Sequence, residues 1–569
     1  MKIIEKSNGT YKLTKDLKVL SIPSTIQDVI MARVDHLPEG AREVLRTGSV
    51  IEREFSHELI RKVTGLPEKQ LLSDLSTLRD SELLYERGIY PNSTYIFKHA
   101  LTREVVYDSI LTKKRKQIHA RIVRTIEEIF GDNICECYGV LANHCMACEN
   151  YEKGAEYARL EARKYQKAGS FRDAIDYTKK SVGCLEKLPD TEVNQKRIID
   201  ARAALGLYIG QMMYFIEAKE VVEPAVEMAI RLGYRKRLPA LFTIVGAYHF
   251  WVEEDFPQAF EYLTNAIKIS EEVADFISFV LANLWSSTAR AVNCEFELAL
   301  TCLRTALDVC SAGNNLMGIS TMKSNISCYN SFYGKTTIAY ECGVDAVKTA
   351  EKSGDLFSKA IAYISLGFAY YCRGLLDEAE KNFLAGKDFS CRINLFWWSA
   401  FADFNLGRIC FEADKYQKSH DHYLEAVSAL EQIRAMPSFI IFLRILAARS
   451  KVMMAGKTDL DKVYSWFHEN KFRLYDGWMP RYIADILLRM DGNHISESEN
   501  WIIKAIEANT ANGMMFESAK SNALYADFFK KKGDIQGARE QLTKAIELFR
   551  ECGADGWVTR TERKLAAIS

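Results

Sequence analysis

The sequence has no excess of charge of either sign, because lysine and arginine together number 75 and aspartate and glutamate also number 75. A net charge of zero provides no global field that would attract nucleic acid or an anionic membrane surface. Long apolar runs are also absent. The most apolar late stretch, FIIFLRILAARSKVMM at 439–454, contains Arg444, Arg449 and Lys451, which are too many charges for a membrane span. We therefore expect no membrane partner.

Closely spaced cysteines in a short chain would indicate a disulfide framework, and the sequence does not have that pattern. Its 14 cysteines are scattered singly over 569 residues, which is typical of reduced thiols in the cytosol. The first residues, MKIIEKSNGTYK, lack the apolar segment of a secretory signal. The sequence thus predicts a cytoplasmic protein.

A complete phosphate-binding loop is also missing, although two Gly-Lys-Thr triplets occur, at 334–336 and 456–458. Such a loop needs another glycine five positions before the Gly-Lys pair, because its backbone turns tightly to point successive N–H groups at the phosphates. Those positions hold Tyr329 and Lys451. We expect no nucleotide cofactor, no catalytic residue and no enzymatic activity in this chain.

What the sequence does have is an internal repeat. Small residues recur at intervals of 40 positions. A second series of small residues, with the same interval, lies twelve positions earlier. The first series is Ala259, Ala299, Ala339, Ala379 and Ser419. The second series is Ala247, Ser287, Ser327, Gly367 and Gly407. Self-similarity at a fixed period of this length indicates a solenoid of stacked units.

The residue types in each unit indicate a helical hairpin. A small residue in one helix, a turn, and small residues seven apart in the next helix let two antiparallel helices approach closely. The segments 367–389 and 526–549 resemble tetratricopeptide (TPR) repeats in residue choice, with a period longer than the usual 34. We predict about ten hairpins over 155–569, degenerate at 440–500, with Gly334 in a turn between two helices.

The first 150 residues do not follow this period. Their pattern predicts helices near 24–36, 39–50, 55–63 and 67–79, followed by a hairpin built from LLYERG and YIF. Short helices followed by a β hairpin predict a winged-helix domain over 23–112. An amphipathic basic stretch then predicts connecting helices over 113–154. The expected fold class is mainly all-α, a winged-helix module followed by a TPR-like α-solenoid superhelix.

Three stretches carry a resemblance to a known family: IPSTIQDVIMARVDHLPEGAREVLRTGSVIEREF at 22–55, YIFKHALTREVVYDSIL at 95–111, and LANHCMACENYEKGAEYARLEARKYQKAGSFRDAIDY at 141–177. They resemble the region that joins the ATPase core to the TPR array in bacterial proteins with a class III adenylate/guanylate cyclase and a STAND-type AAA ATPase. The resemblance implies that cyclase and ATPase modules lie upstream, in cis or in trans. It also implies that residues 1–22 are the remnant linker of the ATPase module.

Two further groups of residues have a functional and a structural interpretation. Cysteines and a histidine at 135–148 are numerous enough for zinc, but they are not arranged as two chelating pairs from turns, so packing within helices is favoured and no metal is expected. The basic run 113–116 follows the winged helix, yet the candidate recognition helix at 67–82 carries several acids. Phosphate contacts need positive charge where a helix approaches the backbone, so nucleic acid is not the expected partner.

Aromatic residues on the first helices of several units are the candidate partner-binding residues. These are Trp251, Trp285, Phe396, Trp397 and Trp398. A concave TPR groove binds protein or peptide partners, and tryptophan tends to dominate binding energy. Adjacent residues on a helix point about 100° apart, so Trp397 and Trp398 cannot both face the same groove, and core packing is the alternative for each.

The sequence therefore favours a regulatory, protein- or ligand-binding portion of a STAND-type signalling system, with the solenoid as sensor or scaffold and the winged helix as coupling element. One alternative is a stand-alone TPR scaffold protein. Another is a fragment of a MalT-like transcription regulator, although the final residues, DGWVTRTERKLAAIS, form another repeat-like helix rather than a DNA-binding helix-turn-helix.

Overall fold

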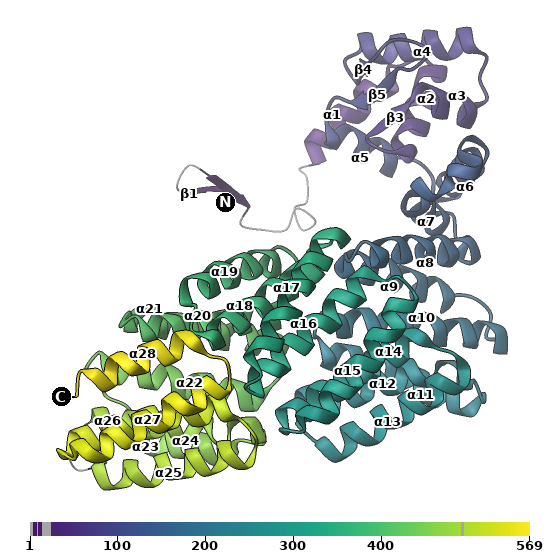
Figure 1. The fold of residues 1–569 in the computed structure, drawn as a ribbon. Helices are drawn as coiled ribbons and strands as arrows, with labels where there is room; N and C mark the ends of the chain where they lie inside the picture. The colour runs from purple at the N-terminus through teal and green to yellow at the C-terminus, as the bar shows by residue number, and fades with distance from the viewer. Residues whose placement is uncertain (1–3, 8–9, 14–23, 491–493, 569) are drawn as a thin grey trace. The chain divides into compact units, whose positions relative to one another are not determined.

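A computed structural model of the chain describes residues 4–7, 10–13, 24–490 and 494–568 (Figure 1). Two compact units divide it: one comprises 1–161 with 183–188, and the other comprises 162–182 with 189–569. The strands β1 (Ile4–Ser7) and β2 (Thr10–Leu13) pair antiparallel. The rest of the proposed linker, residues 1–3, 8–9 and 14–22, lies outside the described residues.

The first unit begins with short helices and a small sheet. Its elements are α1 (Ser24–Asp35), α2 (Glu39–Ile51), β3 (Glu54–Ser56), α3 (His57–Thr64), α4 (Glu68–Asp80), β4 (Leu84–Arg87) and β5 (Thr94–Phe97). The strands form an antiparallel sheet in the order β3-β5-β4. Four helices and the β4–β5 hairpin thus occupy the segments that the sequence indicates.

One expectation was wrong at a helix boundary. The predicted helix at 55–63 begins at His57, because residues 54–56 form a third strand, in which Phe55 pairs with Tyr95. The side chain of Ser56 then accepts a hydrogen bond from the backbone N–H of Leu59, which caps the start of α3. A three-residue strand is too short to show an alternating pattern in the sequence.

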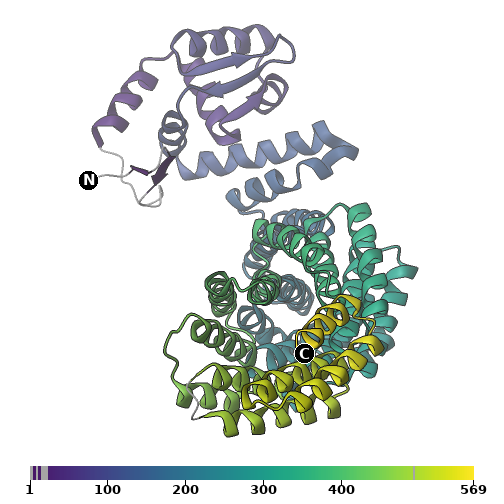
Figure 2. The same ribbon diagram turned by 60° about the vertical axis from the view of Figure 1, so that its left-hand side comes forward.

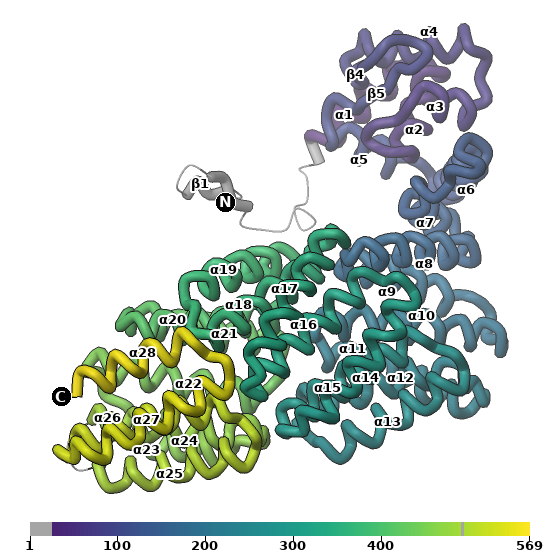
Figure 3. The backbone as a smooth tube through the Cα atoms, viewed as in Figure 1, coloured from purple at the N-terminus to yellow at the C-terminus, as the bar shows by residue number. Residues whose placement is uncertain are grey.

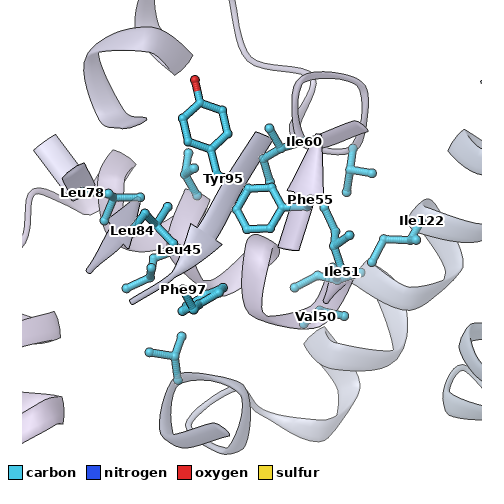
Figure 4. Packing of buried hydrophobic residues seen from close by; sticks show 14 of the residues in the cluster. Leu45, Val50, Ile51, Phe55, Ile60, Leu78, Leu84, Tyr95, Phe97 and Ile122 are labelled. Atoms are coloured by element: carbon cyan, nitrogen blue, oxygen red, sulfur yellow. The ribbon is translucent and has the colours of Figure 1, made fainter. Parts of the chain in front are cut away.

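The core of this unit lies between the helices and one face of the sheet (Figure 4). Phe55 packs edge-on against Phe97, with ring centroids 6.2 Å apart, and Ile51 and Ile60 are also buried there. Gly48 of α2 faces the Phe55 ring, and a Cβ at this position would come within 2.7 Å of it. A side chain at 48 would therefore force helix and sheet apart.

Helices continue after the sheet in the order α5 (Ala100–Asp108), α6 (Thr112–Phe130), α7 (Tyr138–Ala147) and α8 (Tyr151–Lys167), with a 3₁₀ segment, η2 (Gly131–Glu136), before α7.

The second unit is a solenoid of antiparallel helix pairs. After α8, its helices are α9 (Phe171–Leu185), α10 (Glu192–Gln211), α11 (Phe215–Arg231), α12 (Leu238–Tyr248), α13 (Phe256–Val273), α14 (Phe276–Val292), α15 (Phe296–Ala312), α16 (Leu316–Phe332), α17 (Thr336–Ser353), α18 (Leu356–Arg373), α19 (Leu376–Arg392), α20 (Phe396–Glu412), α21 (Tyr416–Ile433), α22 (Pro437–Met453), α23 (Leu460–Glu469), α24 (Trp478–Arg489), α25 (Ile495–Ala511), α26 (Met515–Lys532), α27 (Ile535–Glu551) and α28 (Asp555–Ala566). The short segments are η3 (Arg235–Arg237), a π-helical turn η4 (His249–Glu253), and η5 (Arg473–Tyr475).

Each pair of helices packs side by side, as α18 and α19 do in Figure 3. The prediction of about ten hairpins is confirmed over the described residues.

Through the middle of the solenoid, a residue with a left-handed backbone conformation separates successive helices every 20 positions. These residues, with φ between +48° and +83°, are Glu254, Ala274, Cys294, Asn314, Gly334, Gly354, Gly374, Asn394, Asp414 and Arg434. Such a residue ends a helix and redirects the chain. Two of these breaks fall in each 40-residue unit, which accounts for the period.

The recurring small residues allow helices to touch. Ala259, Ala299 and Ala339 are fully buried. At Gly407, an added Cβ would lie 2.6 Å from the ring of Tyr423 in the partner helix. The predicted close approach of the two helices in each hairpin is therefore present.

Successive turns of this superhelix also touch each other. The backbone N–H of Met436 donates to the carbonyl of Trp251 over 2.7 Å, and the indole Nε1 of Trp557 donates to the carbonyl of Tyr371 over 2.8 Å. The helices curve around a common interior (Figure 2). Part of that interior is closed by contacts between residues nearly 190 positions apart in the chain.

Candidate functional site

The Gly334-Lys335-Thr336 triplet has a structural role, as the sequence predicts. Gly334 has φ +81° in the turn before α17. The Lys335 ammonium pairs with Glu297 at 2.8 Å. Thr336 is fully buried, and its hydroxyl donates to the carbonyl of Cys552 over 2.6 Å. These groups hold two turns of the solenoid together and do not form a phosphate cradle.

We expect the purified chain to show no saturable ATP binding up to about 1 mM, the upper end of ordinary substrate affinities, and no ATP hydrolysis. The positions five before the two Gly-Lys pairs hold Tyr329 and Lys451 rather than glycine, and the Thr336 hydroxyl is buried and donates to a backbone carbonyl, so neither triplet has the backbone or the side chains of a phosphate-binding loop. Isothermal titration calorimetry measures this directly. Binding that disappears in Lys335→Ala would contradict the prediction.

Within the cysteine and histidine group at 135–148, His144 and Cys145 are buried in the first unit, whereas Cys135 is exposed and Cys137 and Cys148 are half-buried. The Nδ1 atoms of His144 and His119 lie 2.7 Å apart. Burial, followed by nearby positive charge, lowers the pKa of His119 to about 4 and that of His144 to about 3, so both rings are neutral at pH 7. Burial also raises the pKa of the Cys145 thiol to about 12, which disfavours the thiolate that a zinc site requires.

Within the described part of the chain, the one group of acidic, histidine and cysteine side chains close enough to hold a metal ion is Asp403, His422 and Glu425. The Lys387 ammonium already lies between the two carboxylates, 2.6 Å from Asp403 and 2.7 Å from Glu425. Burial alone would lower the pKa of His422, but its hydrogen bond to Asp403 raises it to about 9. The carboxylates are thus neutralised by cations of the protein itself.

Four of the five candidate aromatic residues come together. Trp251, Trp285, Trp397 and Trp398 line one cavity inside the solenoid. The Trp251 and Trp397 rings meet edge to face with centroids 4.9 Å apart. Phe396 packs on Tyr214 instead, with centroids 6.4 Å apart.

The cavity holds about 100 Å³ and is lined largely by rings. Phe401 and Phe404 enter from α20, Phe439 from α22, and Tyr475 and Trp478 from the α23–α24 region. Aromatic side chains give large, rigid contact surfaces. The chamber therefore fits an apolar group of the size of one side chain.

Two polar atoms in this wall have no partner. Among the described residues, the buried indole Nε1 atoms of Trp251 and Trp478 have no hydrogen-bond acceptor. The two side chains are only 3% and 1% exposed. Buried donors are nearly always paired, and an unpaired one costs about 1–3 kcal/mol.

A wider cavity of about 390 Å³ continues from the chamber. The two share the lining residues Gln211, Leu284, Thr321 and Phe357. At its rim, Phe276 and Ile277 begin α14 with exposed fractions of 65% and 64%. We call these two neighbouring cavities together the aromatic channel, whose wider part has the exposed apolar rim and whose narrower part is the chamber lined by the tryptophans.

Sequence reasoning missed Tyr475 and Trp478 as channel residues. They lie in the stretch at 440–500 where the repeat pattern is degenerate, so no position in a unit could be assigned to them. The density of aromatic residues there was the available signal.

No helix among the described residues is long and apolar enough to cross a membrane.

No family model matches the chain. An uncharacterized protein of Rhizobium meliloti (strain 1021) is 23% identical over 211 residues, which make up 37% of this chain and 20% of that protein. The match thus spans one fifth of the length of this relative.

Similar solved structures include the STAND protein with a tetratricopeptide repeat sensor from Pyrococcus horikoshii, at 13% identity and a TM-score of 0.46, over 87% of this chain and 68% of that one. A Rap protein complexed with competence and sporulation factor has 14% identity and a TM-score of 0.44, over 73% and 100% of the two chains. Human IFIT1 with PPP-AAAA has 14% identity and a TM-score of 0.37, over 76% and 90%.

Proposed function

We propose that the solenoid is a sensor or scaffold that binds an extended peptide segment of a protein partner in the aromatic channel. The observation that carries this proposal is the chamber in which Trp251, Trp285, Trp397 and Trp398 come together, with a few polar side chains such as Gln211 and Asn325 in its wall.

A peptide matches the size and the lining of the channel. One apolar side chain of the peptide fills the chamber of about 100 Å³, and polar lining side chains such as Gln211 and Asn325 are available to the peptide backbone. The exposed Phe276 and Ile277 at the rim contact the flanking residues. Such anchors, buried in a pocket and surrounded by weaker contacts, supply most of the affinity in interfaces of this kind.

We further propose that the chain is the regulatory portion of a STAND-type signalling ATPase or cyclase system, acting on that module in cis or in trans. This rests on the resemblance of the segments at 22–55, 95–111 and 141–177, and on the helices and three-stranded sheet that occupy 24–97, the order expected of a winged helix. In this scheme the winged helix couples the solenoid to the nucleotide module.

The contacts of the basic run after the winged helix weigh against nucleic-acid binding. Lys114 pairs with Glu43 at 2.8 Å, and Lys116 pairs with Glu149 at 2.6 Å. Arg115 lies over the Tyr107 ring, 4.6 Å from its centroid. Cations held by groups of the protein itself are poorly placed to release counterions from DNA.

The peptide proposal is tested by selecting a phage-displayed library of random peptides on the purified chain. We expect enriched peptides to share one aromatic or branched apolar residue. Replacing Phe276 or Ile277 with serine should weaken a selected peptide about 10-fold, since truncating an apolar interface anchor costs more than about 1 kcal/mol. Fluorescence polarisation with the labelled peptide gives both affinities.

Ile230→Ser is the matched control, because Ile230 is 60% exposed on α11 and does not line the channel. If Phe276→Ser and Ile277→Ser bind the peptide as tightly as wild type does, and Ile230→Ser also does, the channel is not the peptide site.

A further inference from the structure

A second pocket, of about 300 Å³, lies where the last helix, α28, packs near α18. Side chains from α20, α22, α24 and α26 form its remaining walls. It differs in chemistry from the aromatic channel, because most of its lining side chains are charged and the basic ones outnumber the acidic ones.

The two most deeply buried arginines at this pocket do not each have a carboxylate of their own. Arg408 and Arg481, 3% and 4% exposed, share the single carboxylate of Glu517, at 3.1 and 2.5 Å. Glu517 is itself 2% exposed. Two buried guanidinium groups on one carboxylate leave an excess of positive charge away from water, which is costly unless another anion is present.

A second carboxylate of the pocket, Asp485, also contacts two cations, one of which, Arg489, lies in the field of Asp527 as well. Asp485 accepts from Arg449 at 2.6 Å and from Arg489 at 3.1 Å. By contrast, Lys520 and Glu412 form a one-to-one pair at 2.6 Å.

The pKa of Lys520 is lowered to about 8, chiefly by burial. Arg481 and Arg408 lower it further, but by less than Glu412 raises it. An anion entering the pocket would reduce the field that destabilises the charged ammonium.

Aromatic rings cover part of the charged groups, whose side chains are 17% exposed for Arg449 and 16% for Lys520. The Arg449 guanidinium lies 3.4 Å from the centroid of the Phe411 ring, and the Lys520 ammonium lies 3.6 Å from that of Trp557. Charges interact more strongly where rings exclude water. Arg408 also keeps its buried Nε without a partner among the described residues.

We propose that this pocket binds a small anionic molecule that presents a carboxylate or a phosphate group. Guanidinium groups suit both, because their N–H donors match the oxygens of carboxylate and phosphate. Arg560 and Lys564 of α28 line the pocket near its exposed side, where they attract the anion. The proposal is independent of peptide binding in the aromatic channel.

The test uses inorganic pyrophosphate as the phosphate probe and citrate as the carboxylate probe, each titrated calorimetrically into the full chain at low salt. We expect saturable binding of at least one probe with a Kd below about 1 mM. The double variant Arg560→Gln/Lys564→Gln should bind at least 10-fold more weakly, because it removes two attracting charges at the exposed side of the pocket. Which probe binds identifies the anion class.

Arg563→Gln is the control, since Arg563 lies on the same helix, is exposed, and does not line the pocket. Trp557 gives a second readout: its fluorescence should change on probe binding, and Trp557→Phe should abolish that change. No binding of either probe, or equal binding by the double variant and Arg563→Gln, would overturn the proposal.

Discussion

Replacing Glu517 with glutamine is expected to destabilise the solenoid by about 3–5 kcal/mol, because removing one partner of a buried ion pair leaves uncompensated charge away from water. Two cations lose their partner in this variant, because both Arg408 and Arg481 pair with the Glu517 carboxylate. Glutamine keeps the shape of the side chain, so the effect reports on charge rather than on a new cavity.

The measurement is urea-induced unfolding followed by tryptophan fluorescence. All 8 tryptophans lie after residue 250, so the signal reports on the solenoid alone. The shift of the midpoint, multiplied by the m-value, gives the change in the free energy of unfolding.

Glu297→Gln is the matched control for charge removal at an exposed pair. Glu297 and its partner Lys335 are 60% and 42% exposed as side chains, and exposed pairs contribute about 0–1 kcal/mol. If Glu517→Gln shifts the midpoint no more than Glu297→Gln does, the buried charges are compensated by groups other than Glu517.

The sequence allowed prediction of the repeat but not of every turn within it. Gly334 and Gly374 mark turns, and both have positive φ as such turns require. Equivalent left-handed positions are occupied by Cys294 and Arg434, whose residue types do not single out a turn. The 40-residue period was visible because small residues are needed wherever two helices touch, as at Ala339.

The aromatic channel was predictable only in part, for a physical reason. Trp251 and Trp397 could be proposed from their places on first helices, but their contact with each other depends on the curvature of the whole array. The same holds for Phe171 and Phe357, whose ring centroids are 5.1 Å apart. No local pattern encodes a contact between successive turns of a superhelix, because it results from small rotations accumulated over several units.

Gly374→Ala should detach the last helix, whereas Gly354→Ala should not. Both glycines end a helix with nearly the same backbone conformation, φ +83° and +80°, so alanine carries the same strain at either site, about 1–2 kcal/mol. The surroundings differ. A Cβ at 374 would lie 2.5 Å from the backbone N of Trp557 and 2.7 Å from the Cα of Gly556, whereas a Cβ at 354 would have nothing within 4 Å.

Because backbone atoms cannot move aside as a flexible side chain can, α28 must shift away from α18 in Gly374→Ala. The shift breaks the hydrogen bond from Trp557 to Tyr371 and exposes a tryptophan whose burial is worth about 3–5 kcal/mol. Trypsin should then cut after Arg560, Arg563 and Lys564 at least 10-fold faster than in wild type, as intact mass spectrometry will show. Gly354→Ala should be cut at the wild-type rate. Equal cleavage of the two variants would mean that α28 is held by contacts other than its approach to Gly374.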